Sequence, residues 1–149
     1  VLEHVPNPRE VVQSLHNVLN ADGAIFLQVP NDFSDLQNLA LKQGKINGEH
    51  WFAPPQHLSY FNPETLSNFL TELNFEICDG FGDFPIETFL WGNETNYTVD
   101  KKLGRFAHDG RISLDNCFAK NGIEKYINFY RAAFDVGFCR NMVVLARPV

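Results

Sequence analysis

Apolar residues recur at helical spacing in three separate stretches of the chain. The first stretch follows Asn7-Pro8, an amino-terminal cap with proline at the first helical position, and it ends at Asp22-Gly23. The spacing puts its apolar residues on one face of an amphipathic helix. These residues are Val11, Val12, Leu15, Val18 and Leu19.

The second stretch repeats the same start at Asn62-Pro63 and predicts another amphipathic helix. The third lies in residues 123–134, and a shorter helix is expected over residues 34–41. The apolar face of the second helix is Leu66, Phe69, Leu70 and Leu73, and that of the third is Ile123, Tyr126, Ile127, Tyr130 and Phe134.

Short apolar runs predict strands at residues 24–29, 75–81 and 142–146. The first run is nearly continuous, as in strands buried on both faces of a parallel sheet. We interpret Val1-Leu2 as the end of a further strand, so that strand, helix and strand form a βαβ unit. Residues 84–111 mix glycine, polar residues and isolated aromatics without a sustained period, which predicts a loop-rich insertion.

Composition narrows the class of protein. A chain of 149 residues with 44% hydrophobic side chains is long enough for one core and one folding unit. A net charge of -6 argues against nucleic acid as a partner, because nucleic-acid binding needs clustered Lys and Arg. The three cysteines lack CxxC pairing, which argues against disulfides and favours a reducing, cytoplasmic location. No apolar run approaches the ~20 residues that span a membrane, so no membrane partner is expected.

Three segments resemble signatures of small-molecule class I S-adenosylmethionine-dependent methyltransferases, including the ubiquinone-biosynthesis type. Residues 1–8 resemble their hydrophobic-Leu-Glu-His-hydrophobic-Pro-x-Pro segment. Residues 19–31 resemble a Leu-x-Pro-Gly-Gly turn and a strand ending in Val-Pro-Asn, although Ala21 and Asp22 replace Pro and the first Gly. Residues 57–66 resemble His-x-x-Tyr-Phe-x-x-Glu-x-Leu. The order of the three matches makes the resemblance more specific than any one of them.

This resemblance implies an α/β fold, the carboxyl-terminal half of a Rossmann-like class I methyltransferase sheet with flanking helices and a helical insertion before the last strand. We expect one partial domain over residues 1–149. Residues 1–82 and 140–149 would form the sheet core, and residues 83–139 an insertion or acceptor-side lid. The chain opens at Val1 in an apolar pair without Met, which we interpret as a start in the middle of a fold.

The cofactor implied by the resemblance is S-adenosylmethionine. In such proteins a glycine-rich turn and an acidic residue near the start of the domain hold it, as in dinucleotide sites. This sequence shows neither, so we expect the isolated chain to have little affinity for it. Ligands of open α/β sheets lie outside the carboxyl ends of the strands, which places Leu2, Glu3 and His4 as cofactor-binding candidates. The alternative is that Glu3 and His4 only cap local structure.

Candidates for the chemistry follow from the same edge of the sheet. His57 and His4 are the catalytic candidates, since an imidazole can take a proton from a hydroxyl or amine acceptor. The resemblance places Asn31 at the start of a loop over the acceptor pocket, and Trp51 and Tyr60 are further substrate-binding candidates. The alternatives are backbone bonding by His57 and simple packing by the aromatics. No metal is expected, since His50 and His57 lack the i, i+4 spacing of a helical pair.

The sequence therefore predicts methyl transfer to a small-molecule acceptor, with this chain as the acceptor-side half and inactive alone. A possible homodimer follows from the aromatic face of the third helix. The alternative is a non-catalytic remnant that pairs through an exposed sheet edge. A different α/β enzyme, such as a hydrolase, lacks support because the sequence has no G-x-S-x-G elbow.

Overall fold

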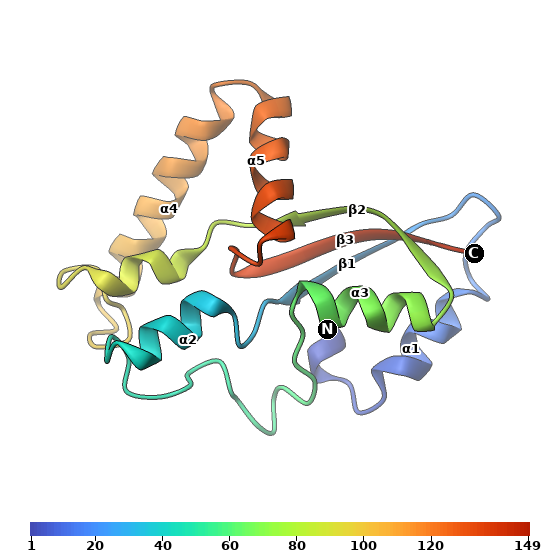
Figure 1. Ribbon diagram of the computed structural model, residues 1–149, viewed down its shortest axis with the longest axis horizontal. Helices are drawn as coiled ribbons and strands as arrows, with labels where there is room; N and C mark the ends of the chain where they lie inside the picture. Colours follow the sequence, from blue (N-terminus) through green and yellow to red (C-terminus); the bar gives the residue numbers. More distant parts are fainter.

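The computed structural model describes residues 1–149, in which three strands form one sheet (Figure 1). The strands are β1 (Ile25–Pro30), β2 (Phe75–Gly82) and β3 (Asn141–Pro148), in the spatial order β1-β3-β2. β3 pairs antiparallel with both neighbours. The last strand of the chain is therefore the centre of the sheet, and β1 and β2 run in the same direction on either side of it.

Helices cover the sheet and connect its strands. α1 (Pro8–Leu15) and α3 (Pro63–Glu72) lie on one side, and α5 (Ile123–Asp135) lies on the other against β2 (Figure 1). α2 (Asp35–Lys42) and α3 carry the chain from β1 to β2. The main core joins α1 and α3 to the sheet through Val12, Leu66, Leu70, Phe75, Met142 and Val144, all fully or almost fully buried.

Local capping explains where the predicted helices begin. Asn7 accepts a bond from the Glu10 amide, and Ser34 and Gln37 form a reciprocal capping box at α2. Asn62 and Thr65 do the same for α3. The helices at Asn7-Pro8, residues 34–41, Asn62-Pro63 and residues 123–134 are therefore confirmed. The first helix ends at Leu15 instead of continuing through Leu19.

Two predictions about the sheet were wrong. The segment at Val1-Leu2 is not a strand, because Leu2–His4 forms a short 3-10 helix, η1, whose His4 amide bonds the Val1 carbonyl at 3.0 Å. Without a strand beside it, this backbone satisfies its polar groups locally. β1 is consequently an edge strand with an antiparallel neighbour, and Phe26 on it is exposed. The predicted parallel βαβ unit and burial on both faces do not occur.

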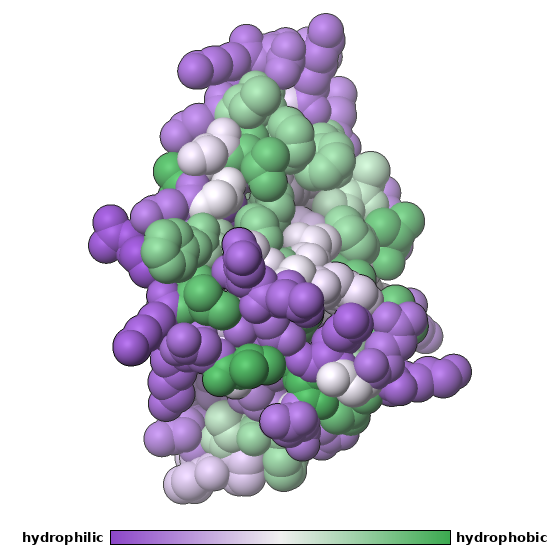
Figure 2. Space-filling view, turned by 90° about the vertical axis from the view of Figure 1, so that its left-hand side faces the viewer, coloured by the Kyte–Doolittle hydropathy of each residue, from purple (hydrophilic) through white to green (hydrophobic).

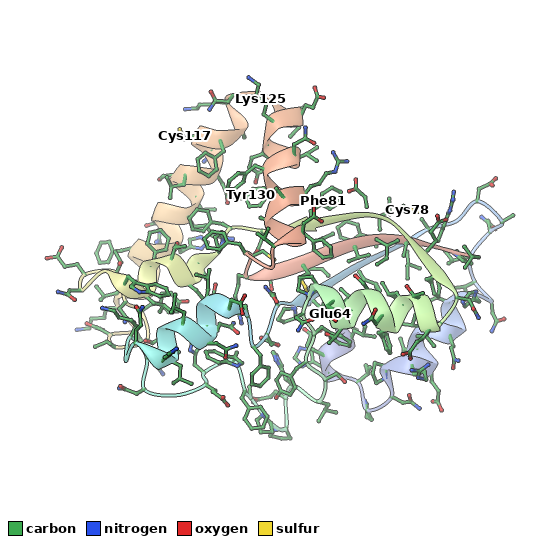
Figure 3. All side chains as sticks on the ribbon, in the orientation of Figure 1. Glu64, Cys78, Phe81, Cys117, Lys125 and Tyr130 are labelled. Atoms are coloured by element: carbon green, nitrogen blue, oxygen red, sulfur yellow. The ribbon has the colours of Figure 1, made fainter.

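The region predicted as loop-rich contains a long helix. α4 (Leu103–Ala119) and η2 (Ile86–Trp91) lie mostly in residues 84–111, where no period was recognised. α4 packs on α5 and η2, and Tyr130 of α5, labelled in Figure 3, hydrogen-bonds Asp115 of α4. Only Ala107 of α4 is fully buried, so the helix depends on contacts with neighbours instead of on a continuous apolar stripe.

The α4–α5 hairpin leaves apolar side chains exposed on its outside. Figure 2 shows the face on which α4 lies, where hydrophobic residues gather above a polar band. The exposed apolar residues of α4 are Phe106, Ile112 and Leu114. The homodimer stays a prediction. No helix of the protein combines the length and apolar character needed to cross a membrane.

Candidate functional site

Polar residues from three separate segments meet where β1 and β2 end and β3 begins. Asn31 and Asp32 follow β1, Asp83 follows β2, and Arg140 precedes β3. The Asn31 amide bonds the Arg140 carbonyl at 2.9 Å, and the Asp32 amide bonds the Phe61 carbonyl at 2.9 Å. Asp83 Oδ1 accepts the main-chain amides of Arg140 and Asn141 at 3.0 and 2.6 Å. The strand ends are thereby fixed beside one another.

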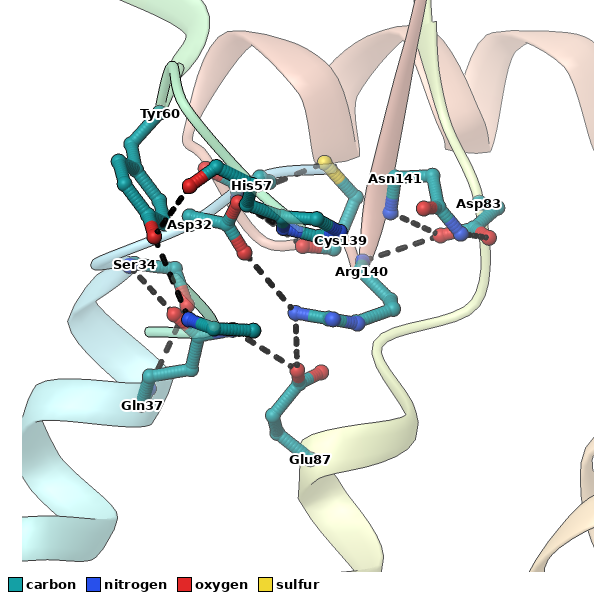
Figure 4. Close-up of polar contacts among 12 residues, drawn as sticks. Asp32, Ser34, Gln37, His57, Tyr60, Asp83, Glu87, Cys139, Arg140 and Asn141 are labelled. Atoms are coloured by element: carbon teal, nitrogen blue, oxygen red, sulfur yellow. Dashed lines mark hydrogen bonds and ion pairs between the residues drawn. The ribbon is translucent and has the colours of Figure 1, made fainter. Parts of the chain in front are cut away.

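His57 faces the carboxylate of Asp32 within this group (Figure 4). His57 Nδ1 lies 3.9 Å from Asp32 Oδ2, and both atoms are buried without a hydrogen-bond partner. The separation exceeds a hydrogen bond by less than 1 Å, and such catalytic contacts often shorten when substrate binds. The Asp32 carboxylate can therefore hold the proton of His57 on Nδ1.

Arg140 links Asp32 to a second buried acid, Glu87 of η2. Its Nη1 lies 3.5 Å from Asp32 Oδ1 and 3.5 Å from Glu87 Oε1. Dashed lines in Figure 4 mark both contacts. Gln37 Nε2 donates to Glu87 Oε1 at 3.2 Å. Burial raises the pKa of Asp32 and of Glu87, and the Arg140 charge opposes the rise in both.

Glu3 and His4 also lie close to His57. The rings of His4 and His57 are 4.8 Å apart, edge to face, and His4 Nδ1 contacts the Gln56 carbonyl at 2.7 Å. The Glu3 carbonyl accepts the amides of Leu58 and Ser59 at 2.7 and 3.2 Å. The chain start and the His57 loop are thus tied together, and the two predicted catalytic histidines are neighbours.

Glu3, His4 and His57 are the residues near this site whose side chains could together hold a metal ion. One ligand atom each from Glu3, His4 and His57 lies within 4.8 Å of the others. The Glu3 and His4 groups already contact each other, because Glu3 Oε1 lies 3.3 Å from His4 Nε2. We assign no metal to the trio.

The three predicted substrate-binding residues have different surroundings. Tyr60 donates to the His57 carbonyl at 3.1 Å and accepts the Ala53 amide at 3.3 Å, so it braces the loop that carries His57. Asn31 is buried and donates to the carbonyls of Gly137 and Cys139, both at 2.9 Å. Trp51 is buried with Ala40, Ile46 and Leu90. Of these three residues, Tyr60 is the one that hydrogen-bonds His57.

An aromatic group lies beside His57. Tyr60 is 6.2 Å from His57 by ring centroids, and Phe33 and Phe52 are 5.5 and 5.4 Å from Tyr60. Phe33 and Phe52 are exposed. Phe33 also has a φ of 57°, a left-handed conformation that is rare for a bulky residue and that directly follows Asp32. Exposed rings next to the partly buried imidazole of His57 form a surface on which a planar apolar ligand can stack.

The residues assigned to the cofactor divide into two kinds. Leu2 is buried in the main core. Glu3 and His4 bring a carboxylate and a half-exposed imidazole to the site, and such groups suit a ligand that carries an amino group and hydroxyls.

Sequence reasoning missed the residues that surround His57. Asp32 follows the predicted Val-Pro-Asn strand end, so its position at the sheet edge was a usable signal. Arg140 immediately precedes the predicted last strand and had the same signal. No such signal exists for Glu87, because this residue lies in residues 84–111, where the apolar residues show no helix or strand spacing.

Comparison with known proteins agrees with this architecture. A family model described as a methyltransferase domain matches residues 1–79, more than half of the chain. A ubiquinone biosynthesis O-methyltransferase from Glaesserella parasuis serovar 5 (strain SH0165) is 28% identical in an alignment of 102 residues, and the alignment covers 63% of this chain. The chain spans 41% of that relative's length. The chain therefore belongs to the methyltransferase domain family, within the class I S-adenosylmethionine-dependent methyltransferases.

Proposed function

We propose that this chain forms the acceptor side of an enzyme that transfers a methyl group from S-adenosylmethionine to a hydroxyl oxygen of a small molecule, and that it is inactive alone. The observation that carries the proposal is the pair of buried, unpartnered atoms, His57 Nδ1 and Asp32 Oδ2, that face each other at 3.9 Å. A partly buried imidazole whose Nδ1 faces a buried carboxylate is the arrangement of a general base. The family membership supplies the reaction class.

In this proposal, His57, Asp32 and Tyr60 each have a separate role in methyl transfer. S-adenosylmethionine, when bound, supplies a methyl group on a positively charged sulfur that leaves as a neutral thioether. Neutral His57 accepts the hydroxyl proton through Nε2 as the new oxygen–carbon bond forms, and Asp32 stabilises the resulting imidazolium. His4 and Glu3 border the reacting groups, and Tyr60 keeps the His57 loop in place. Alignment of the acceptor oxygen supplies the rest of the rate.

Two features favour an aromatic hydroxyl as the acceptor. Phe33, Phe52 and Tyr60 offer rings beside His57 on which a planar molecule can stack. The similar protein from Glaesserella parasuis is named as an O-methyltransferase, which favours oxygen over nitrogen or carbon as the methylated atom.

Residues 83–139 supply Glu87 and the α4–α5 hairpin, which supports a role for this segment as an acceptor-side lid.

Methyl transfer can be tested directly. The protein, and any longer product of the same gene, is incubated with S-adenosylmethionine labelled in its methyl group and with matched phenol and aniline acceptors. Binding of S-adenosylmethionine is measured in parallel by calorimetry. We expect label in the phenol only, from the longer product, with loss of transfer in His57→Gln. Label only in the aniline, or equal transfer by His57→Gln, would contradict the proposal.

A second candidate function is pairing through the free edge of β1. β1 is bonded on one side only, and a cavity of about 490 Å³ lies beside it. Its lining includes Val11, Leu15 and Phe26, of which Phe26 is 66% exposed. An unpaired apolar edge of this kind pairs readily with another strand. Light scattering of the wild type and of Phe26→Lys tests this candidate, which requires a dimer that the substitution dissociates.

A further inference from the structure

The guanidinium group of Arg140 forms ion pairs with two buried carboxylates, those of Asp32 and Glu87. Arg140 Nη1 contacts both Asp32 and Glu87 at 3.5 Å, and the side chains of both acids are 1% exposed. A buried carboxylate has lost its water and stays ionised only with a partner. The charge of Asp32 therefore depends on where Arg140 is held.

Arg140 is held from two directions. Glu87 of η2 attracts its guanidinium, and Glu87 is itself fixed by Gln37 Nε2 at 3.2 Å. The main chain of Arg140 donates to Asp83 Oδ1 at 3.0 Å. These contacts come from α2, η2 and the end of β2, so the side chain of Arg140 has little freedom to leave Asp32.

The two oxygens of Asp32 have different tasks. Oδ1 faces Arg140, whereas Oδ2 faces His57 and has no hydrogen bond. The contact at Oδ1 fixes the rotation of the carboxylate and so leaves Oδ2 directed at Nδ1. The charged and titratable groups that face Asp32 are Arg140, His57 and Glu3. Arg140 counteracts the effect of burial, which raises the Asp32 pKa.

We propose that Arg140 and Glu87 are positioning residues, which keep Asp32 ionised and turned toward His57 and thereby keep the proton of the neutral imidazole on Nδ1. Nε2 is then left to accept the proton of the acceptor. The inference deepens the proposed function and rests on it for its catalytic meaning. It also assigns a role to the 83–139 segment, since η2 supplies Glu87.

Nuclear magnetic resonance on the full chain tests the positioning without any need for activity. The variants are Arg140→Gln and Glu87→Gln, with Arg147→Gln as the control on the same strand, where Arg147 forms an exposed pair with Glu76. Nitrogen-15 spectra report which nitrogen of His57 carries the proton, and carbon-13 spectra follow the Asp32 carboxyl through a pH titration. An Asp32→Asn variant assigns the carboxyl signal.

We expect the Nδ1–H form in the wild type and in Arg147→Gln. In Arg140→Gln the Asp32 carboxyl titrates at higher pH and His57 shifts toward the Nε2–H form, and Glu87→Gln changes both in the same direction by less. An unchanged tautomer and an unchanged Asp32 titration in both variants overturn the inference. If Arg140→Gln does not fold, Glu87→Gln decides, because glutamine preserves the bond to Gln37.

Kinetics on the active protein separates this inference from the proposed function. In Arg140→Gln we expect kcat to fall about 10²-fold with KM unchanged, the lower end of what a positioned acid–base group contributes. A wild type with the Nδ1–H tautomer but without transfer to hydroxyl acceptors would remove the proposed function and leave the positioning in place. Transfer that is unaffected in Arg140→Gln would remove the positioning role alone.

Discussion

The close approach of β2 to the segment before β3 makes a quantitative prediction at Gly82. A Cβ atom added there would lie 2.4 Å from Cys139 Cβ and 3.0 Å from its Sγ. Cβ positions follow the backbone, so β2 and the chain at Cys139 must separate. Overpacking of this kind costs about 1–3 kcal/mol. The loss of unfolded-state freedom returns about 0.4–1 kcal/mol. The midpoints of these two ranges give a net destabilisation of about 1.3 kcal/mol for Gly82→Ala.

Urea unfolding followed by circular dichroism measures this loss as a lower midpoint with an unchanged slope. Two partner substitutions identify the cause. Cys139→Gly removes the opposing Cβ and should recover most of the loss in a double-mutant cycle, whereas Cys139→Ala keeps that Cβ and should recover little. Wild-type stability of Gly82→Ala, or equal recovery by both partners, would refute the reasoning. A shift of the chain at Cys139 would also move Arg140, the next residue, which contacts Asp32 in the candidate site.

The remaining predictions concern packing and charge. Leu70→Ala should cost about 2–5 kcal/mol in urea unfolding, since the side chain is fully buried in the main core, and a smaller cost than this would contradict that packing. Burial raises the pKa of Glu87 above its ordinary value of 4.5, so the folded protein holds that proton more tightly than the unfolded chain. The contribution of protonated Glu87 to the free energy of unfolding is therefore complete below pH 4.5 and is lost as the pH rises through the raised pKa. Glu87→Gln should reduce this fall in stability, whereas Glu124→Gln, at an exposed position, should not. Tyr60→Phe should lower stability by about 1 kcal/mol and lower methyl transfer through a looser His57 loop, and unchanged values would argue against bracing by the hydroxyl.

Local signals in the sequence predicted most helices and strands. Asn7, Ser34 and Asn62 cap helices with the bonds expected of their side chains, because capping depends on residues within one turn. The direction of the strands could not be read in this way. β3 is antiparallel because of its partners 60 or more residues away, and an apolar run has the same appearance in either direction.

The site was predicted in part for the same reason. His57 and His4 were found from segments that resemble a known family, and the structure brings their rings together. Asp32 and Arg140 meet across more than 100 residues of sequence, so their pairing follows from the fold and not from a motif. α4 was missed because its stability comes from packing on α5 and η2.

The pH dependence of kcat/KM for methyl transfer to a phenolic acceptor tests the central claim most directly. Wild type, His57→Gln and the control Arg147→Gln, each as the longer product of the gene, are compared from weakly acidic to neutral pH. We expect wild type and control to lose rate at low pH, because the imidazole must be neutral to accept a proton. His57→Gln should be about 10²–10⁴-fold slower and lack that loss. A His57→Gln enzyme with the wild-type rate and profile would contradict His57 as the base.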